Sequence, residues 1–207
     1  GLCYLKAAVK KHLPEIEVIV RDYHSGFGRK TIPLPGELSY LAEYYPAADK
    51  SPFSAFHQYY HFGKLFDAIE DELAEIKPDA VGISSLFTPY FREALEVAKR
   101  VKSSIGVPVI MGGPHVSGVP ESVLASSYVD YVVRGEGERP LVELLKYLSG
   151  NGTLEDVSNL GYKSGNTLQF NKMQDNYHID ELPVPDLSDF TPDRYQLAGK
   201  SLTSILT

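Results

Sequence analysis

Short apolar runs alternate with amphipathic stretches along the first 150 residues of this chain, and no other feature constrains its fold as strongly. Runs rich in β-branched residues predict strands at 15–20, 80–84, 107–113 and 129–135. Apolar residues at helical spacing predict helices at 2–13, 62–76, 91–101, 119–126 and 138–148. Strands that alternate with helices of this length join through right-handed βαβ crossovers. We therefore expect an α/β fold with a Rossmann-like or flavodoxin-like doubly wound parallel sheet, covered by helices on both faces.

Residues 23–61 interrupt the alternation with a long connection rich in Gly, Pro and Tyr. A connection of that length is uncommon in a compact domain unless it is functional or disordered. Its aromatic residues predict packing against the body of the domain, through a short helix near 52–61.

The pattern changes again after residue 150. The stretch "LGYKSGNTLQF" predicts a hairpin that turns at Ser164-Gly165-Asn166. The Pro- and Asp-rich "DELPVPDLSDFTPD" predicts a linker, and "SLTSILT" predicts one more strand. We expect an α/β domain at 1–150, followed by a hairpin and an extended linker at 151–207.

Composition excludes several classes of protein. Apolar residues make up 43% of the chain and charged residues 23%, as in ordinary globular proteins. The net charge of −7 argues against nucleic acid or an anionic membrane as a partner, because both need a basic surface. Cys3 is the only cysteine, so these residues offer no disulfide framework and no thiolate-bound cluster. The first residues lack a signal-peptide pattern, and we expect a cytoplasmic protein.

Glycines and hydroxyl side chains follow three successive predicted strands. In open parallel sheets, ligands bind beyond the carboxyl ends of the strands. Glycine lets a ligand approach the backbone, and hydroxyls both donate and accept hydrogen bonds. Taken singly, a serine pair is more often a helix cap and a glycine pair a tight turn, but three such groups on one edge favour a slot for a long, partly apolar ligand. The predicted slot residues are Ser84, Ser85, Leu86, Thr88, Gly112, Gly113, Pro114, His115, Gly135, Glu136 and Gly137.

These residues resemble a known family. Ser84-x-Leu86 with Thr88-Pro89, and Gly112-Gly113 about 28 positions later, look like the Ser-x-Leu and Gly-Gly elements of cobalamin (B12)-binding domains. Through "SPFSAFHQYYHFG", "SLFTPYFREALEVAK", "MGGPHVSGVPE" and "VDYVVRGEGERPLVELL", residues 1–150 resemble the B12-binding domain that precedes a radical SAM domain. The segments "ELPVPDLSDF" and "SLTSILT" resemble the linker and the first barrel strand of those enzymes.

The resemblance implies a cofactor and a place for it. The nucleotide tail of cobalamin would enter the slot, where Ser84 or Ser85 would meet the dimethylbenzimidazole, Leu86 would pack on it and Gly112-Gly113 would give it room. The turn at 135–137 would close the mouth, and the corrin ring would face the radical SAM domain of the same parent chain. That parent would also use a 4Fe-4S cluster and S-adenosylmethionine, neither bound by these residues, for methyl transfer or a radical rearrangement. We expect these 207 residues alone to be inactive.

Two departures from the family pattern qualify this expectation. The Asp-x-His-x-x-Gly element that supplies a histidine to cobalt is absent, because Phe27 follows Asp22 and His24 where glycine is needed. His24 is thus expected to be a loop histidine, and the base is expected to be detached from cobalt. The first strand of the family also has no counterpart here, since the sequence opens in the first predicted helix. A speculative alternative places "LTSIL" at 202–206 in or near that gap.

The sequence leaves a metal site and two other functions as alternatives. His57 and His61 have a spacing that suits metal ligands on a helix, but no third ligand is evident. A flavodoxin-like enzyme or transferase would bind a nucleotide at the same edge, yet no Gly-x-Gly-x-x-Gly or phosphate-loop motif occurs, and Glu136 and Glu138 would repel phosphates. A protein-interaction or regulatory module could use the insertion as its contact surface. A cobalamin spectrum would favour the first function, nucleotide-dependent melting the second, and indifference to small ligands the third.

Overall fold

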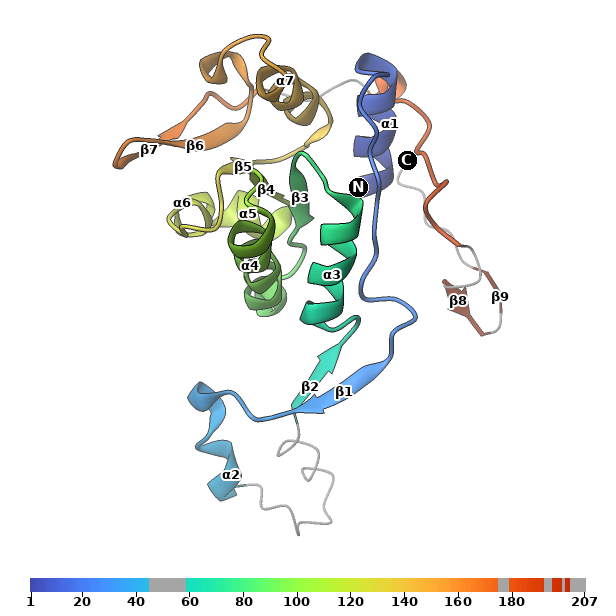
Figure 1. Ribbon diagram of the computed structural model, residues 1–207, viewed down its shortest axis with the longest axis vertical. Helices are drawn as coiled ribbons and strands as arrows, with labels where there is room; N and C mark the ends of the chain where they lie inside the picture. Colours follow the sequence, from blue (N-terminus) through green and yellow to red (C-terminus); the bar gives the residue numbers. More distant parts are fainter. Residues whose placement is uncertain (45–58, 175–178, 192–194, 199, 202–207) are drawn as a thin grey trace.

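The computed structural model describes residues 1–44, 59–174, 179–191, 195–198 and 200–201. Its body is a five-stranded sheet with strand order β3-β4-β5-β6-β7 (Figure 1). The strands are β1 (Arg29–Ile32), β2 (Tyr59–Phe62), β3 (Val81–Ser84), β4 (Val109–Gly112), β5 (Tyr131–Val133), β6 (Leu160–Ser164), β7 (Thr167–Phe170), β8 (Gln196–Leu197) and β9 (Lys200–Ser201). The helices are α1 (Leu2–His12), α2 (Leu41–Tyr44), α3 (Phe66–Ile76), α4 (Phe91–Arg100), α5 (Pro114–Gly118), α6 (Pro120–Leu124) and α7 (Glu138–Leu148).

The first three strands of the sheet are parallel, as predicted. β3 pairs with β4 in a register that places Ser84 beside Gly112, and β4 pairs with β5 so that Gly112 lies beside Val133. The predicted hairpin also forms, as β6 and β7, and it continues the same sheet antiparallel to β5. Gly161 permits this pairing, because a Cβ there would lie 2.5 Å from the ring of Phe170. The division of the chain at residue 150 stays a prediction.

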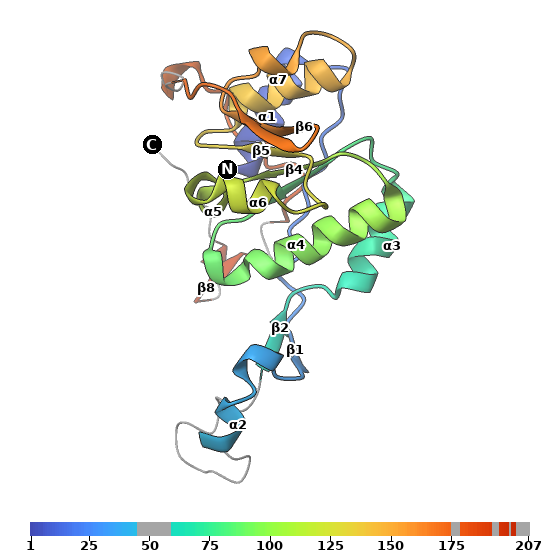
Figure 2. The same cartoon turned by 90° about the vertical axis from the view of Figure 1, so that its left-hand side faces the viewer.

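Helices cover both faces of the sheet, which confirms the doubly wound prediction (Figure 2). On one face, side chains of α4 and α6 pack on the sheet in a cluster of fully buried residues. These include Ala98, Val101, Val109, Met111, Val123, Leu124 and Val132. On the other face, Leu144 of α7 packs with Ile110 and Val133. α1 packs on the outside of α7 through Val9 and Val142. The near-continuous apolar strands are explained by this burial on both sides.

One predicted strand does not form, and one predicted helix begins later than expected. Residues 15–20 are not a strand: Glu15 lies in a turn, Ile16 in a bend, and 17–20 have no ladder partner among the described residues. The helix predicted at 62–76 begins only at Phe66, because Phe62 belongs to β2. The helix ends at Ile76 as expected, where Lys77 adopts a left-handed conformation and donates its N–H to the carbonyl of Leu73 at 3.0 Å.

The described part of the insertion forms an arm. β1 and β2 pair antiparallel, and Figures 1 and 2 show the ladder extending away from the sheet. The helix predicted near 52–61 is therefore wrong at 59–61, where β2 lies, and 52–58 fall outside the described residues. The aromatic side chain of Tyr60 contacts Arg29 and Phe62, and the predicted packing of the aromatic residues against the body of the domain stays a prediction.

The predicted linker at 180–191 lies along α1. The N–H of Asp186 donates to the carbonyl of Cys3 at 3.1 Å, and the Nζ of Lys6 contacts the carboxylate of Asp189 at 2.6 Å. Farther on, Ser201 ends β9, whereas 202–207 lie outside the described residues. Within the described parts of the chain, no helix is both long and apolar enough to span a membrane.

Candidate functional site

The chain leaves the sheet at Ser85, one residue after β3 ends. The N–H of Ser85 donates to the carbonyl of Gly112 at 2.8 Å, and its own carbonyl accepts the N–H of His115 at 3.2 Å. Ser85 is only 4% exposed, and its Oγ has no hydrogen-bond partner in the described structure. The loops after β3 and β4 therefore hold between them a buried hydroxyl that no other described residue satisfies.

Gly113 makes the contact between these two loops possible. Its φ is 107°, and a Cβ at this position would lie 2.7 Å from the carbonyl oxygen of Ser85. Only glycine combines that backbone conformation with so close an approach. Gly112 is less constrained, since a Cβ there would lie 3.7 Å from the carbonyl oxygen of Val133. Close packing against Ser85 is therefore enough to explain why glycine occupies position 113, without any contact to a ligand.

His115 lies beside Ser85 in the first turn of α5, directly after Pro114. Its Nδ1 is 3.0 Å from the Oγ1 of Thr88, and its ring packs on Phe91 with the centroids 4.4 Å apart. The Nε2 atom is buried and has no partner in the described residues. Two polar atoms without partners, the Ser85 hydroxyl and the His115 imidazole nitrogen, therefore come from neighbouring loops at the carboxyl edge of the sheet.

Ser117 joins the loop after β5 to the loop after β4, and it was not among the predicted site residues. Its hydroxyl donates to the carbonyl of Gly113 at 3.1 Å and accepts the N–H of Gly135 at 2.8 Å. The spacing from Gly113 is that of a serine bonding back to the carbonyl four residues earlier in a helix, and this signal could have found it. The predicted residues after β3, β4 and β5 are thus connected.

Large apolar side chains border this edge. Leu86, Phe87 and Tyr90 are 59%, 61% and 62% exposed, and the rings of Phe87 and Tyr90 meet edge to face at 6.3 Å. We call these three residues the apolar lip. Contiguous exposed side chains of this size mark a contact surface. Only Leu86 was among the predicted site residues.

Two carboxylates lie beyond β5. Glu136 is exposed, whereas Glu138 is buried in the first turn of α7, which Gly137 precedes. Burial raises the pKa of Glu138, and the nearby charge of Glu136 raises it further, despite hydrogen bonds from the backbone N–H groups of Glu138 and Gly137. This acidic margin disfavours a polyphosphate ligand at the mouth of the slot.

Ser84 and the two described histidines considered as metal ligands make no hydrogen bond to the buried Ser85 hydroxyl. Ser84 is exposed at the end of β3, and His24 stacks on Phe62 of the arm, with the ring centroids 6.5 Å apart. The Nε2 of His61 is 3.0 Å from the carbonyl oxygen of Lys64, and its partner in the proposed spacing, His57, lies outside the described residues. Within the described residues, no group of three His, Cys, Asp or Glu side chains is placed to hold a metal.

Comparison with known proteins shows what the chain is similar to. Residues 54–145 match the family model of the B12-binding domain. The chain is 30% identical over 159 residues to an uncharacterized methyltransferase of Pyrococcus horikoshii, covering 71% of this chain and 34% of the relative. It is 26% identical over 166 residues to the cytidylyl-2-hydroxyethylphosphonate methyltransferase of Streptomyces wedmorensis, covering 79% of this chain and 27% of the relative. The chain therefore spans about a third or less of these two relatives.

A solved structure supports the fold. The cobalamin-dependent S-adenosylmethionine radical enzyme OxsB, with aqua-cobalamin and S-adenosylmethionine bound, superposes with a TM-score of 0.54 at 22% identity. The superposition covers 61% of this chain and 18% of the enzyme. At this identity, the similarity supports the shared α/β architecture.

Proposed function

Residues 54–145 of this chain are a B12-binding domain, and from this premise we propose that the slot beyond β3, β4 and β5 holds the nucleotide tail of cobalamin. The observation that carries the proposal is the buried Ser85 hydroxyl without a partner. Native folds rarely bury such a group unsatisfied, because the loss of its hydrogen bonds to water costs about 1–3 kcal/mol. A ligand that enters between the loops and offers a ring nitrogen or an oxygen would satisfy it.

The residues present fit the chemistry of this cofactor. Cobalamin combines a flat, largely apolar base and macrocycle with amide groups along its rim. The Ser85 hydroxyl and the His115 Nε2 offer hydrogen bonds, and the apolar lip offers a surface for a large ring. The acidic side chains Glu136 and Glu138 suit amide donors better than a nucleoside polyphosphate. The donor set thus favours cobalamin over the nucleotide alternative.

Each group of residues has a role in this proposal. Ser85, or its exposed neighbour Ser84, holds the base of the nucleotide tail, and Thr88 orients His115 through Nδ1 so that Nε2 faces the ligand. Ser117 keeps the loops after β4 and β5 together while the tail is in place. We propose that the base is detached from cobalt because the slot holds it, and that no histidine takes its place, because His24 lies on the arm.

Bound cobalamin would supply a cobalt centre for group transfer or electron transfer, whereas the protein supplies binding and orientation. We propose that the parent protein carries a radical SAM domain in the same chain, with a 4Fe-4S cluster and S-adenosylmethionine. The names of the two relatives favour methyl transfer as its reaction. We assign binding alone to residues 1–207.

Replacing Ser85 with alanine separates cofactor binding from stability. Loss of one hydrogen bond to the cofactor should weaken binding about 5- to 10-fold, since a net hydrogen bond contributes about 1 kcal/mol. The free energy of unfolding without ligand should stay the same or rise by about 1 kcal/mol, because a buried hydroxyl without a partner is removed. A visible-absorption titration with hydroxocobalamin, followed by gel filtration, measures the first quantity, and urea unfolding measures the second.

The exposed Ser122 provides the matched control, since its replacement with alanine should change neither quantity. Equal cobalamin affinity in the wild type and Ser85→Ala would exclude Ser85 as a contact. Wild-type protein that elutes without colour, but whose melting temperature rises with a nucleotide, would favour the flavodoxin-like alternative.

A further inference from the structure

The chain that leaves the hairpin β6–β7 lies against the loop after β5. A Cβ added to Gly135 would lie 3.3 Å from the Cε of Met173, so the methyl group of this methionine lies close to the turn at 135–137. Gly135 is also the residue whose N–H donates to the Ser117 hydroxyl at 2.8 Å. Met173 therefore borders the candidate site, although it lies outside residues 54–145, which match the family model.

The backbone on both sides of Met173 is held by one buried asparagine. Asn159 is only 2% exposed, and its N–H donates to the carbonyl of Lys172 at 3.2 Å. Its side-chain oxygen accepts the N–H of Gln174 at 2.7 Å. Asn159 has a φ of 59°, a left-handed conformation that asparagine adopts more readily than most residues. The backbone of Met173 is thus fixed between two hydrogen bonds to a residue inside the fold.

Arg134 ties the same segment to the loop after β5. It directly precedes Gly135, and both its N–H and its Nε donate to the carbonyl of Asn159, at 3.1 and 3.4 Å. Its Nη2 donates to the carbonyl of Asn171 at the end of the hairpin. The loop after β5 and the chain that carries Met173 are therefore joined as one unit, and these bonds set the position of Met173 over Gly135.

The side chain of Met173 itself is only half buried. It is 47% exposed, whereas Met111, the other methionine of the chain, is fully buried in β4. Single exposed apolar side chains are common on protein surfaces, but Met173 differs from them because its backbone is fixed against the candidate site. A contact residue needs such support, since a rigid backbone presents the side chain to a ligand in one place. The thioether is polarizable and adaptable, and it packs favourably on flat rings.

We propose that Met173 forms a wall of the cofactor slot and packs on a flat, apolar part of bound cobalamin. This inference rests on the proposed function, and it extends the slot from the family-matched residues to the hairpin. The cofactor then receives apolar contacts from two directions in the chain, from the apolar lip after β3 and from Met173 after β7. The hairpin contributes to cofactor affinity in addition to extending the sheet.

Oxidation of methionine by hydrogen peroxide tests this contact on the full chain. Peroxide transfers one oxygen atom to the thioether and leaves water, and the rate depends on the exposure of the sulfur. With hydroxocobalamin at about ten times its Kd, formation of the Met173 sulfoxide should slow about 10-fold, since about a tenth of the protein is then free. Met111 should oxidise slowly with and without cofactor. Peptide mass spectrometry measures both methionines, and N-acetylmethionine in the same solution reports any peroxide lost to the cofactor.

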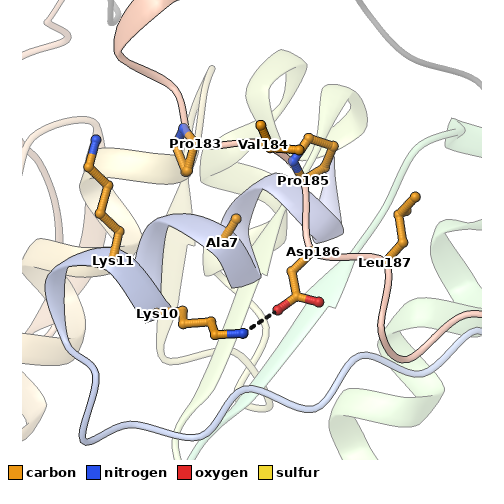
Figure 3. Close-up of a pocket in the computed structure, with 8 residues that line it drawn as sticks. All are labelled: Ala7, Lys10, Lys11, Pro183, Val184, Pro185, Asp186 and Leu187. Carbon is orange, nitrogen blue, oxygen red and sulfur yellow. Dashed lines mark hydrogen bonds and ion pairs between the residues drawn. The ribbon is translucent and has the colours of Figure 1, made fainter.

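Replacement of Met173 provides a second measurement. Met173→Ala should weaken the binding of hydroxocobalamin about 3- to 10-fold, because a half-exposed side chain loses its burial against the ligand. Met173→Leu should bind within about 2-fold of the wild type, since leucine is apolar and of similar volume. The control is Val184→Ala: Val184 is 87% exposed and lines a groove between α1 and the linker (Figure 3). This replacement should leave the affinity unchanged.

The outcomes separate this contact from cofactor binding as such. Colour that elutes with the protein, while Met173 oxidises at the same rate with and without cofactor, would overturn the contact and leave the proposed function in place. Equal affinity of the wild type and Met173→Ala would have the same meaning. A wild type that elutes without colour would overturn both the proposed function and the contact. Gel filtration therefore distinguishes the two failures.

Discussion

Replacing Gly113 with alanine is expected to lower the free energy of unfolding by about 3 kcal/mol. The φ of 107° is strained for any residue with a side chain, and the new Cβ would lie 2.7 Å from the carbonyl oxygen of Ser85 and 3.1 Å from its carbonyl carbon. Both contacts are with backbone atoms, so the loops after β3 and β4 must move apart. Urea unfolding followed by circular dichroism measures the loss.

Gly118 offers a matched control, because it ends α5 five residues after Gly113. A Cβ there would meet no atom within 4 Å, and its φ is ordinary. Gly118→Ala should therefore change the free energy of unfolding by less than about 0.5 kcal/mol. Equal effects of the two replacements would contradict the close approach of Gly113 to Ser85. Because the same loops form the proposed slot, Gly113→Ala should also reduce the binding of hydroxocobalamin in the titration described above.

Replacing Asp189 with alanine is expected to destabilise the protein by about 2 kcal/mol. Its carboxylate accepts hydrogen bonds from the Nζ of Lys6 at 2.6 Å and from the N–H of Val20 at 2.8 Å. The side chains of Lys6 and Asp189 are only 13% and 19% exposed, so the variant removes the charged partner of a largely buried ammonium and leaves it the Ser188 hydroxyl at 2.9 Å. Urea unfolding at neutral pH measures the loss, and limited proteolysis of the linker at 180–191 reports its release from α1.

The ion pair between Glu37 and Arg92 is the control. Its atoms are also 2.6 Å apart, but the two side chains are 61% and 74% exposed. Solvent screens such a pair, so Glu37→Ala should leave the urea midpoint unchanged within error. A loss of stability as large as that of Asp189→Ala would show that burial does not decide the strength of these pairs.

The linker contacts should also be sensitive to acid. Burial raises the pKa of Asp189, but the hydrogen bonds from Lys6 and Val20 outweigh it and leave the pKa below its usual value. Hydrogen bonds from Ser188 and Lys10 likewise lower the pKa of Asp186. A carboxyl whose pKa is lower in the folded state stabilises the protein above its unfolded pKa of about 3.9, and this contribution is lost as the pH falls through the folded pKa.

The difference in unfolding free energy between the wild type and Asp189→Ala should therefore be largest at neutral pH and should shrink below about pH 4. Urea unfolding at a series of pH values measures it. A difference that stays constant down to pH 2 would show that the charge of Asp189 does not contribute.

Local sequence patterns were enough to predict the parallel strands and α7. The apolar runs at β3, β4 and β5 are nearly continuous because both faces of the sheet are covered, and that burial leaves a signal in composition. The bounds of α7, Glu138–Leu148, agree with the prediction because its apolar stripe starts and ends with the helix. The hairpin turn was also predictable, since its residues have strong local preferences.

Other features depend on partners far away in the sequence. Residues 15–20 have the composition of a strand, yet a strand also needs a neighbour, and the described structure provides none. Phe62 continues the apolar stripe of α3, but pairing with Arg29 places it in β2 instead. In both cases the local preference for strand or helix is weak, and the presence or absence of hydrogen bonds to a neighbouring strand decides the structure.

Some features of the candidate site likewise follow from the sequence, and others depend on the tertiary structure. The sequence by itself determined the α/β class and most of the residues that lie at the carboxyl edge of the sheet, where we propose that cobalamin binds, because strand ends follow from local pattern. Only the tertiary structure decided that the Ser85 hydroxyl is buried without a partner, that Gly113 is required by Ser85, and that Ser117 joins two loops. These features depend on contacts between loops that are distant in the chain, and no local periodicity encodes which loops will meet.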